Sequence, residues 1–266
     1  MGSICKYMLT DIISIIDKHK GKTGIVFAHG PSAKKHLPKL LAQSKDKSNF
    51  CFISMGEIDR VQQKLNIRFE LDYWVMANSV MNILNSSDRF NSIPECTLIL
   101  ADSVDISPLT SAWARLKIPS MSYDQRHFDN KPCINCKIPD VIRDGKMEFV
   151  TWPCRVIPGR LTVQEHLQKY TKYESHFTPG STVALNATAM AILMGGKEVH
   201  VYGVDLDYRG GYVDNTTVEY TTGFDPDVDY IVKDFDTIVK SAYNIGVKLI
   251  NFSPNSPIKT VMETVS

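Results

Sequence analysis

Two short loops of similar composition carry groups suited to binding phosphate. One is Ala28-His29-Gly30-Pro31-Ser32, and the other is Thr178-Pro179-Gly180-Ser181-Thr182. Each offers glycine and hydroxyl groups where a helix is expected to begin, and a helix N-terminus exposes unpaired N–H groups and the positive end of its dipole. Two such loops in one domain predict a site for a nucleotide diphosphate, or for a nucleotide linked to a second group. For either loop alone, an ordinary capped turn is the alternative.

Proton transfer has two candidates beside these loops. His29 precedes the first glycine, and an unperturbed imidazole titrates near pH ~6.5, which suits a general base. A simple contact to a nucleotide is the alternative for His29. Asp205 follows the apolar run 199–204. Its carboxylate could orient a ribose, accept a hydrogen bond from a loop amide, or act as a base.

Three lysines and a cysteine pair have weaker signals. Lys34, Lys35 and Lys39 follow the first loop and are typical of a solvated helix face, although Lys34 could also screen phosphate charge. Cys133 and Cys136 are expected to lie in a plain loop as two free thiols; the alternative is that they form half of a tetrahedral zinc site, which His127 and Cys154 could complete. The six cysteines are expected to be free thiols, as in a cytoplasmic protein.

Apolar strand-like runs alternate with helical patterns along most of the chain. Such alternation predicts an α/β fold with a mostly parallel sheet and helices on both faces. Ligands then bind beyond the carboxyl ends of the strands, where Gly30, Ser32 and Asn78 would meet. The expected strands are 24–28, 50–54, 72–77, 97–101, 199–204 and 248–252, and the expected helices include 4–20, 183–194 and 228–245.

The composition is that of an ordinary soluble protein. The chain has 266 residues, 43% of them hydrophobic, and a formal net charge of +1, which gives no argument for a nucleic-acid partner. No apolar run approaches the ~20 residues that span a bilayer, and no signal peptide is apparent. We therefore expect one cytoplasmic Rossmann-like domain over 1–266, with an irregular, lid-like insertion at 124–160 and a flexible loop at 207–227.

The run from Gly180 to Asp205 resembles a segment shared by two groups of proteins. These are the bacterial sialyltransferases of glycosyltransferase family 42 and the motility accessory factors of the MptE-like group. In both, a Ser/Thr-Gly helix start precedes a small-residue helix, a Gly-x-Lys-Glu turn and a strand ending in Gly-Val/Ile-Asp. Gly30-Pro31-Ser32 is similar to the first loop of this group, and Ser253-Pro254-Asn255-Ser256 to its last strand end. The three matches fall in the same order over residues 24–258.

The resemblance implies a metal-independent, sialyltransferase-like glycosyltransferase. Its donor would be a CMP-activated sialic-acid-like (nonulosonic) sugar, with no separate cofactor, and its acceptor a glycan or protein hydroxyl. Peripheral membrane association and homo-oligomerisation stay open. The residues implied in nucleotide binding are Gly30, Pro31, Ser32, Asn78, Gly180, Ser181, Thr182, Tyr208, Tyr212, Asn255 and Ser256, the two tyrosines holding the leaving phosphate.

The chain departs from the family pattern at two positions. The sialyltransferases have Asn where this chain has His29, and their general-base histidine lies in a loop that contains no histidine here, 207–227. The general base is thus His29, Asp205 or another group. Two alternatives remain: a 6-hydroxymethylpterin diphosphokinase-like pyrophosphoryl transferase, which would use Mg²⁺, and a non-catalytic nucleotide-binding protein.

Overall fold

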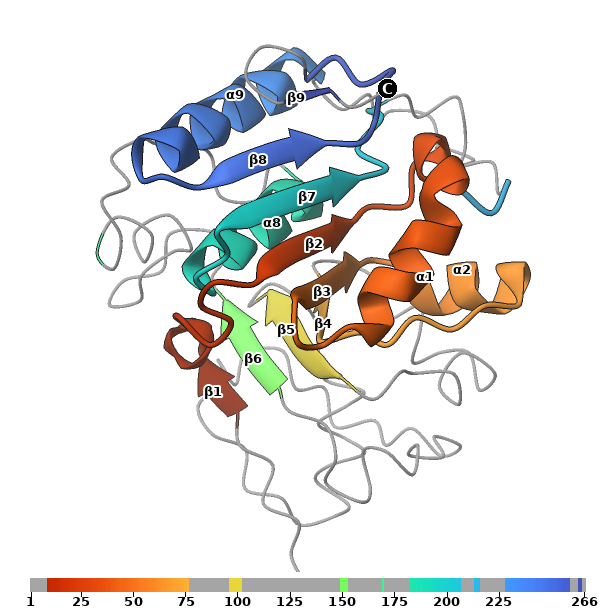
Figure 1. Ribbon diagram of the computed structural model, residues 1–266, viewed down its shortest axis with the longest axis horizontal. Helices are drawn as coiled ribbons and strands as arrows, with labels where there is room; N and C mark the ends of the chain where they lie inside the picture. The colour runs from red at the N-terminus through yellow and green to blue at the C-terminus, as the bar shows by residue number, and fades with distance from the viewer. Residues whose placement is uncertain are drawn as a thin grey trace, which may run out of the picture.

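A parallel sheet forms the centre of the molecule (Figure 1). The computed structural model describes residues 9–76, 96–101, 149–152, 169, 182–206, 213–215, 228–258 and 263–264. Within these residues the sheet has nine strands in the order β1-β6-β5-β4-β3-β2-β7-β8-β9, and every pair is parallel. The strands are β1 (Leu9–Asp11), β2 (Thr23–Phe27), β3 (Phe50–Met55), β4 (Tyr73–Met76), β5 (Thr97–Ala101), β6 (Phe149–Trp152), β7 (Glu198–Tyr202), β8 (Lys248–Asn251) and β9 (Glu263–Thr264).

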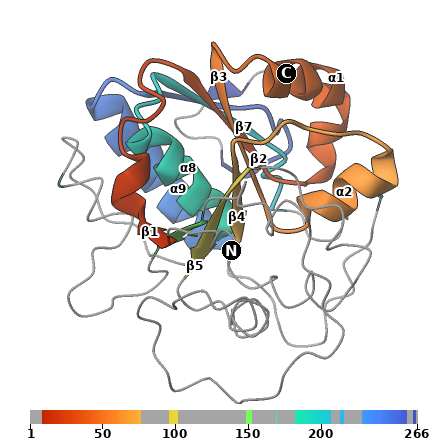
Figure 2. The same cartoon turned by 90° about the horizontal axis from the view of Figure 1, so that it is seen from below.

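Helices cover both faces of this sheet. α1 (Leu37–Lys45) and α2 (Ile58–Leu65) lie on one face, and α8 (Val183–Leu193) and α9 (Val228–Asn244) lie on the other (Figure 2). Two 3₁₀ helices, η1 (Ile12–Ile15) and η2 (Pro31–His36), precede β2 and α1. The predicted α/β fold with a Rossmann-like, parallel sheet is therefore confirmed.

The centre of the core is the contact between β2 and α8. Every residue of β2 is buried, as expected for a strand covered on both faces. α8 is buried along almost its whole length, which fits its small and apolar residues. A Cβ on Gly24 would lie 2.9 Å from Cβ of Ala191, so the glycine lets the helix approach the strand closely.

The strand order reverses at β2, which positions the candidate site. From β2 the sheet extends through β3 and β4 on one side, and through β7 and β8 on the other. Loops after neighbouring strands then diverge, and in open parallel sheets ligands bind outside the carboxyl ends of the strands at this switch point. Here the loops after β2 and β7 occupy that position.

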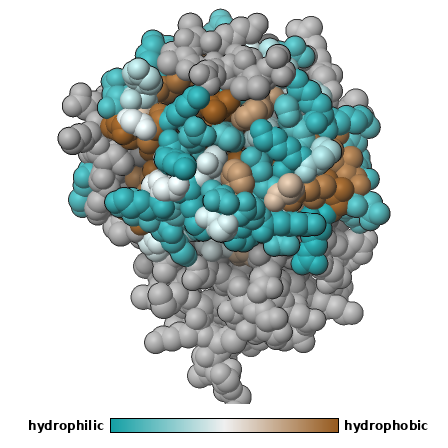
Figure 3. All heavy atoms as spheres, in the orientation of Figure 1, coloured by the Kyte–Doolittle hydropathy of each residue, from teal (hydrophilic) through white to brown (hydrophobic). Residues whose placement is uncertain are grey.

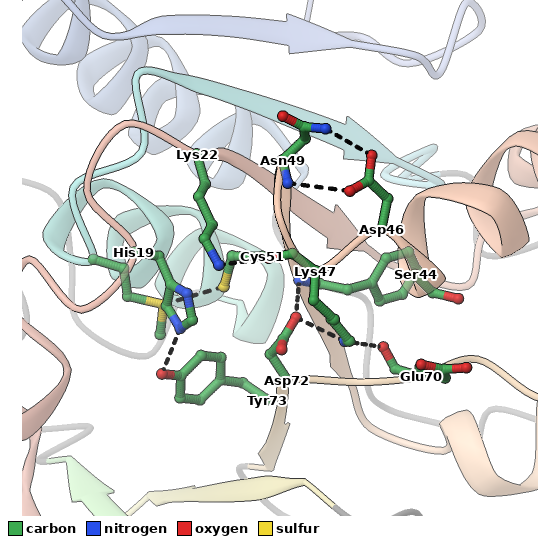
Figure 4. Close-up of polar contacts among 12 residues, drawn as sticks. His19, Lys22, Ser44, Asp46, Lys47, Asn49, Cys51, Glu70, Asp72 and Tyr73 are labelled. Atoms are coloured by element: carbon green, nitrogen blue, oxygen red, sulfur yellow. Dashed lines mark hydrogen bonds and ion pairs between the residues drawn. The ribbon is translucent and has the colours of Figure 1, made fainter.

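At the amino ends of the strands, here called the amino edge of the sheet, hydrogen bonds and an ion pair connect the segments that precede the strands (Figure 4). Lys47 Nζ lies 3.0 Å from Asp72 Oδ2, which also accepts from the Phe52 amide at 2.7 Å. His19 Nε2 lies 2.9 Å from the Tyr73 hydroxyl, and burial lowers the pKa of His19. The backbone N–H of His19 donates to the carbonyl of Met194 at the end of α8. Through His19, the segment before β2 is attached to β4 and to the end of α8.

The predicted helix over 4–20 is wrong in the part that the structure describes. Residues 9–11 form β1 beside β6, and only Ile12–Ile15 are helical, as a short 3₁₀ turn. The isoleucines form the 3₁₀ turn, where their branched Cβ atoms disfavour a longer helix, and Asp17 follows with a positive φ of 55°, which a continuing helix cannot contain. The apolar residues do recur at helical spacing, but residues 9–11 pair with β6 as the outermost strand of the sheet.

A second difference concerns the predicted irregular insertion at 124–160. Residues 149–152 form β6 between β1 and β5. The strand is only four residues long and precedes Pro153, so its β-branched and aromatic residues gave too short a pattern to identify. The rest of that insertion, and most of 207–227, lie outside the described residues, and the single-domain organisation stays a prediction.

None of the helices that the structure describes is long and apolar enough to cross a membrane. On the face that carries η2 and α1, hydrophilic residues cover much of the described surface, with smaller hydrophobic patches between them (Figure 3).

Candidate functional site

The loops after β2 and β7 lie directly against each other. The Ala28 amide donates to the Tyr202 carbonyl at 2.8 Å, and the Gly30 amide donates to the Gly203 carbonyl at 2.9 Å. Gly203 has a φ of +73°, and a Cβ there would overlap the Ala28 carbonyl. A Cβ on Gly30 would overlap Gly203 and Asp205. Glycine is therefore required at both positions for the loops to meet.

Asp205 links the two loops through its side chain. Its Oδ2 accepts from the Ser32 amide at 3.0 Å, and the residue is 6% exposed. Of the three roles left open from the sequence, binding a loop amide is the one that this contact shows. The carboxylate lies at the first turn of η2, where a negative charge is stabilised by the helix dipole.

This contact changes the expected phosphate site at the first loop. Pro31 has no N–H, the Ser32 amide is bound by Asp205, and the Ala33 amide donates to the Gly30 carbonyl at 3.1 Å. The first loop was expected to present unpaired N–H groups, and that expectation is wrong for these residues. A carboxylate of the protein already occupies the position where a phosphate would accept.

His29 is buried beneath the first loop. Its Nε2 lies 3.0 Å from Ser54 Oγ, and Ser54 donates its hydroxyl proton to the Phe27 carbonyl at 3.1 Å. Ser54 can then only accept from His29, so Nε2 carries the proton and Nδ1 the lone pair. Burial lowers the pKa of His29 to about 4, against smaller opposing effects of Asp214 and Asp59. The imidazole is thus neutral at physiological pH, and its role as a base stays a prediction.

Three residues from the predicted flexible loop 207–227 pack against this region. The Val213 amide donates to the His29 carbonyl at 2.7 Å. Asp214 lies 3.8 Å from Lys64 Nζ, and Asn215 Oδ1 accepts from Lys34 Nζ at 3.3 Å. This part of the loop is therefore tied to the elements that follow β2.

The segment after β8 supplies the other side of the site. Ser253 Oγ accepts from the Val204 amide at 3.0 Å, which joins this segment to the loop after β7. Ser256 is 1% exposed, and its hydroxyl accepts from the Ile258 amide at 3.3 Å. Asn255 is exposed. Of the two predicted residues, Asn255 faces outward and Ser256 stabilises the turn.

An open pocket of about 430 Å³ lies between these segments. It brings together Pro31, Ser32 and Asn255, three of the residues predicted from the sequence. The Ser32 hydroxyl is buried and lacks a hydrogen-bond partner. The lining residues are Pro31, Ser32, Lys34, Lys35, Pro254 and Asn255.

Two of the three lysines that follow the first loop, Lys34 and Lys35, lie at the pocket. Both line the pocket, whereas Lys39 lies on another side of the helix, with Nζ 4.2 Å from the centroid of the Phe252 ring. In the sequence, Lys34 and Lys35 differ from Lys39 only in their distance from Ser32, because both lie within one helical turn of it. A solvated helix face and a pocket wall look alike in sequence.

The second predicted loop is described only at its end. α8 begins at Val183, as expected, and Thr182 Oγ1 accepts from the Ala184 amide at 3.4 Å, as an N-cap does. A short turn, 194–197, joins α8 to β7, so Thr182 lies toward the carboxyl ends of the strands. The predicted residues Asn78, Gly180, Ser181, Tyr208 and Tyr212 lie outside the described residues, and their roles stay predictions.

The cysteine and metal predictions are tested only in part. Cys51 and Cys96 are free and buried, and burial raises the pKa of both thiols, so they remain protonated. Cys133 and Cys136 lie outside the described residues, so neither the plain loop expected there nor the alternative zinc site is tested. Across the residues that the structure describes, no group of three or more His, Cys, Asp or Glu side chains is placed to hold a metal ion.

No family model matches the sequence, and a search of curated proteins found no match in sequence. Among solved structures, the chain is similar to the sialyltransferase CstII from Campylobacter jejuni, in complex with a substrate analogue, cytidine-5'-monophosphate. The two chains are 16% identical with a TM-score of 0.44, and the match covers 93% of this chain and 86% of the other. A likeness at this level carries no argument about function, which has to come from the residues themselves.

Proposed function

We propose that the chain is a glycosyltransferase that uses a CMP-activated, sialic-acid-like sugar and transfers it to a glycan or protein hydroxyl. The observation that carries the proposal is the pocket beside the switch point. It joins Pro31 and Ser32 of the first motif to Asn255 of the last motif, although these lie more than 200 residues apart in the sequence. The order of the three motifs, and their resemblance to the sialyltransferases and motility factors, support the choice of a CMP-sugar.

The reaction requires one bond to form and one to break. The acceptor hydroxyl oxygen bonds to the anomeric carbon of the sugar, and the bond from that carbon to the phosphate oxygen breaks. The electron pair of the broken bond stays on the phosphate, and the hydroxyl proton passes to a base. Groups that stabilise the added negative charge on the phosphate therefore lower the barrier.

Two residues remain candidates for the base. Asp205 keeps its second carboxylate oxygen for another contact while Oδ2 holds the Ser32 amide. His29 is a buried, neutral imidazole at physiological pH, because burial lowers its pKa to about 4, and its Nε2 lies against Ser54 Oγ, so its ring is placed to hold the loop. We favour Asp205, and assign His29 to holding the first loop in place through Ser54.

A nucleotide panel tests the proposal. The thermal unfolding midpoint is measured with CMP, CDP, UDP, GDP and ATP, each with and without Mg²⁺. We expect CMP to raise the midpoint most, by the same amount with and without the metal, because only the folded chain binds it. Preferential stabilisation by ATP with Mg²⁺ would favour the pyrophosphoryl transferase instead. Binding of CMP without turnover of any CMP-sugar would favour a non-catalytic nucleotide-binding protein.

A further inference from the structure

We propose that the phosphate of the ligand is held by the side chains of Lys34 and Lys35, and not by the backbone N–H groups of the first loop. This inference rests on the proposed function, because it names the groups that bind one part of the same ligand. It differs from the usual use of a glycine loop at a helix start, where amides bind the anion. The reason lies in how the first turn of η2 is already satisfied.

The first step of the argument is that the loop amides are occupied. Asp205 accepts from Ser32, and the carbonyl of Gly30 accepts from Ala33. An incoming phosphate would have to displace a carboxylate that is 6% exposed and held in place by the hydrogen bond from the Ser32 amide. It would also approach the negative charge of Asp205, and like charges at short range repel. The anion is therefore directed away from Asp205.

The second step is that the same pocket offers positive charge at its other side. Lys34 and Lys35 line it together with Ser32 and Asn255, and none of the described residues that line it is acidic. Both ammonium groups belong to exposed residues, so they reach an anion without loss of packing. Lys34 donates to Asn215 Oδ1, but an ammonium has three donors and can bind a phosphate as well. The Ser32 hydroxyl, which lacks a partner, adds a neutral donor.

The third step links this pair to the reaction. The donor sugar is attached to a phosphodiester with one negative charge, and cleavage leaves a phosphomonoester with up to two. Two ammonium groups attract a phosphate with two negative charges more strongly than a phosphate with one. The lysine pair therefore binds the leaving CMP more tightly than the donor sugar nucleotide. Lys34 and Lys35 would thus act as catalytic residues by stabilising the leaving group.

Isothermal titration calorimetry of the full chain tests this assignment. The ligands are CMP, cytidine and inorganic phosphate, and the variants are Lys34→Gln, Lys35→Gln and the double change. Lys45→Gln is the control, because Lys45 is exposed in the last turn of α1, at the far end from the pocket, and its loss alters net charge equally. We expect each pocket variant to weaken CMP about tenfold, since a charge-assisted hydrogen bond contributes about that much. Cytidine affinity should stay within twofold.

The outcomes separate this inference from the proposed function. If CMP binds equally to all variants, the phosphate lies elsewhere and the inference is overturned while the function stands. If the wild type fails to bind CMP but binds inorganic phosphate in a lysine-dependent way, the phosphate site stands and the function falls. If neither ligand binds, both are overturned. Equal weakening of cytidine and CMP would also contradict the inference, because it would show a loss of pocket shape instead of charge.

Discussion

The polar side chains at the centre of the site make hydrogen bonds to other residues of the chain in the absence of a ligand. Asp205 holds the Ser32 amide, and His29 donates to Ser54, so each has one atom committed to the fold. The sequence identified both residues from their position at strand ends. It could not show these contacts, because their partners lie 25 or more residues away in the chain.

The burial of His29 predicts a pH dependence of stability. The pKa of His29 is about 4 in the folded chain and 6.5 at its ordinary value, so the unfolded chain binds the proton more readily. The free energy of unfolding is therefore highest above pH 6.5 and falls as the pH decreases toward 4, by about 3 kcal/mol from this residue. Urea unfolding between pH 7.5 and 4 measures the effect.

His29→Gln is the matched variant for this measurement. Glutamine can still donate to Ser54 but does not titrate, so its curve should be flatter than that of the wild type. His19, His36 and His200 also have pKa values lowered mainly by burial, and their contribution of the same sign remains in both proteins. Identical slopes in the two proteins would show that His29 is not buried as neutral imidazole.

At the scale of elements, the site depends on two loops that approach each other through glycine. The strand pair β2 and β7 is in register from Thr23 with Glu198 to Phe27 with Tyr202, and the loops continue that contact. Gly203 is essential because its positive φ and its contact with the Ala28 carbonyl both exclude a side chain. The glycines at 30 and 203 are thus needed for the close approach of the two loops, in addition to any role in binding.

A pair of glycine substitutions separates the effect of the positive φ from the effect of the close approach of the two loops. Gly203→Ala and Gly246→Ala both place alanine at positive φ, +73° and +80°, which costs roughly 1–2 kcal/mol. Gly246 has open space around it, whereas a Cβ on Gly203 would overlap backbone. We expect Gly203→Ala to lower the free energy of unfolding by at least about 2 kcal/mol more than Gly246→Ala. Equal losses in urea unfolding would mean that the two loops do not pack closely.

Sequence patterns predicted the elements of the core better than those at the sheet edges. β2, β5, β8, α8 and α9 begin and end within about two residues of their predicted limits, because their apolar runs are long or end at glycine. β1 and β6 were missed because they are only three and four residues long, and their place in the sheet depends on pairing with each other and, for β6, with β5. No local signal distinguishes such pairs.

At the scale of the whole molecule, the two edges of the sheet have different tasks. The amino edge is closed by structural contacts such as the ion pair of Lys47 with Asp72 (Figure 4). The carboxyl edge carries the switch point and the pocket. The central claim is that a cytidine nucleotide binds at the carboxyl edge.

Hydrogen–deuterium exchange with and without CMP tests that claim most directly, because it reports where binding slows the opening of backbone hydrogen bonds. The account predicts slower exchange in residues 29–35 and 253–258 when CMP is present, with no change in 17–22 and 47–51 at the amino edge. Slower exchange confined to the amino edge, or no change in either region at saturating CMP, would contradict it.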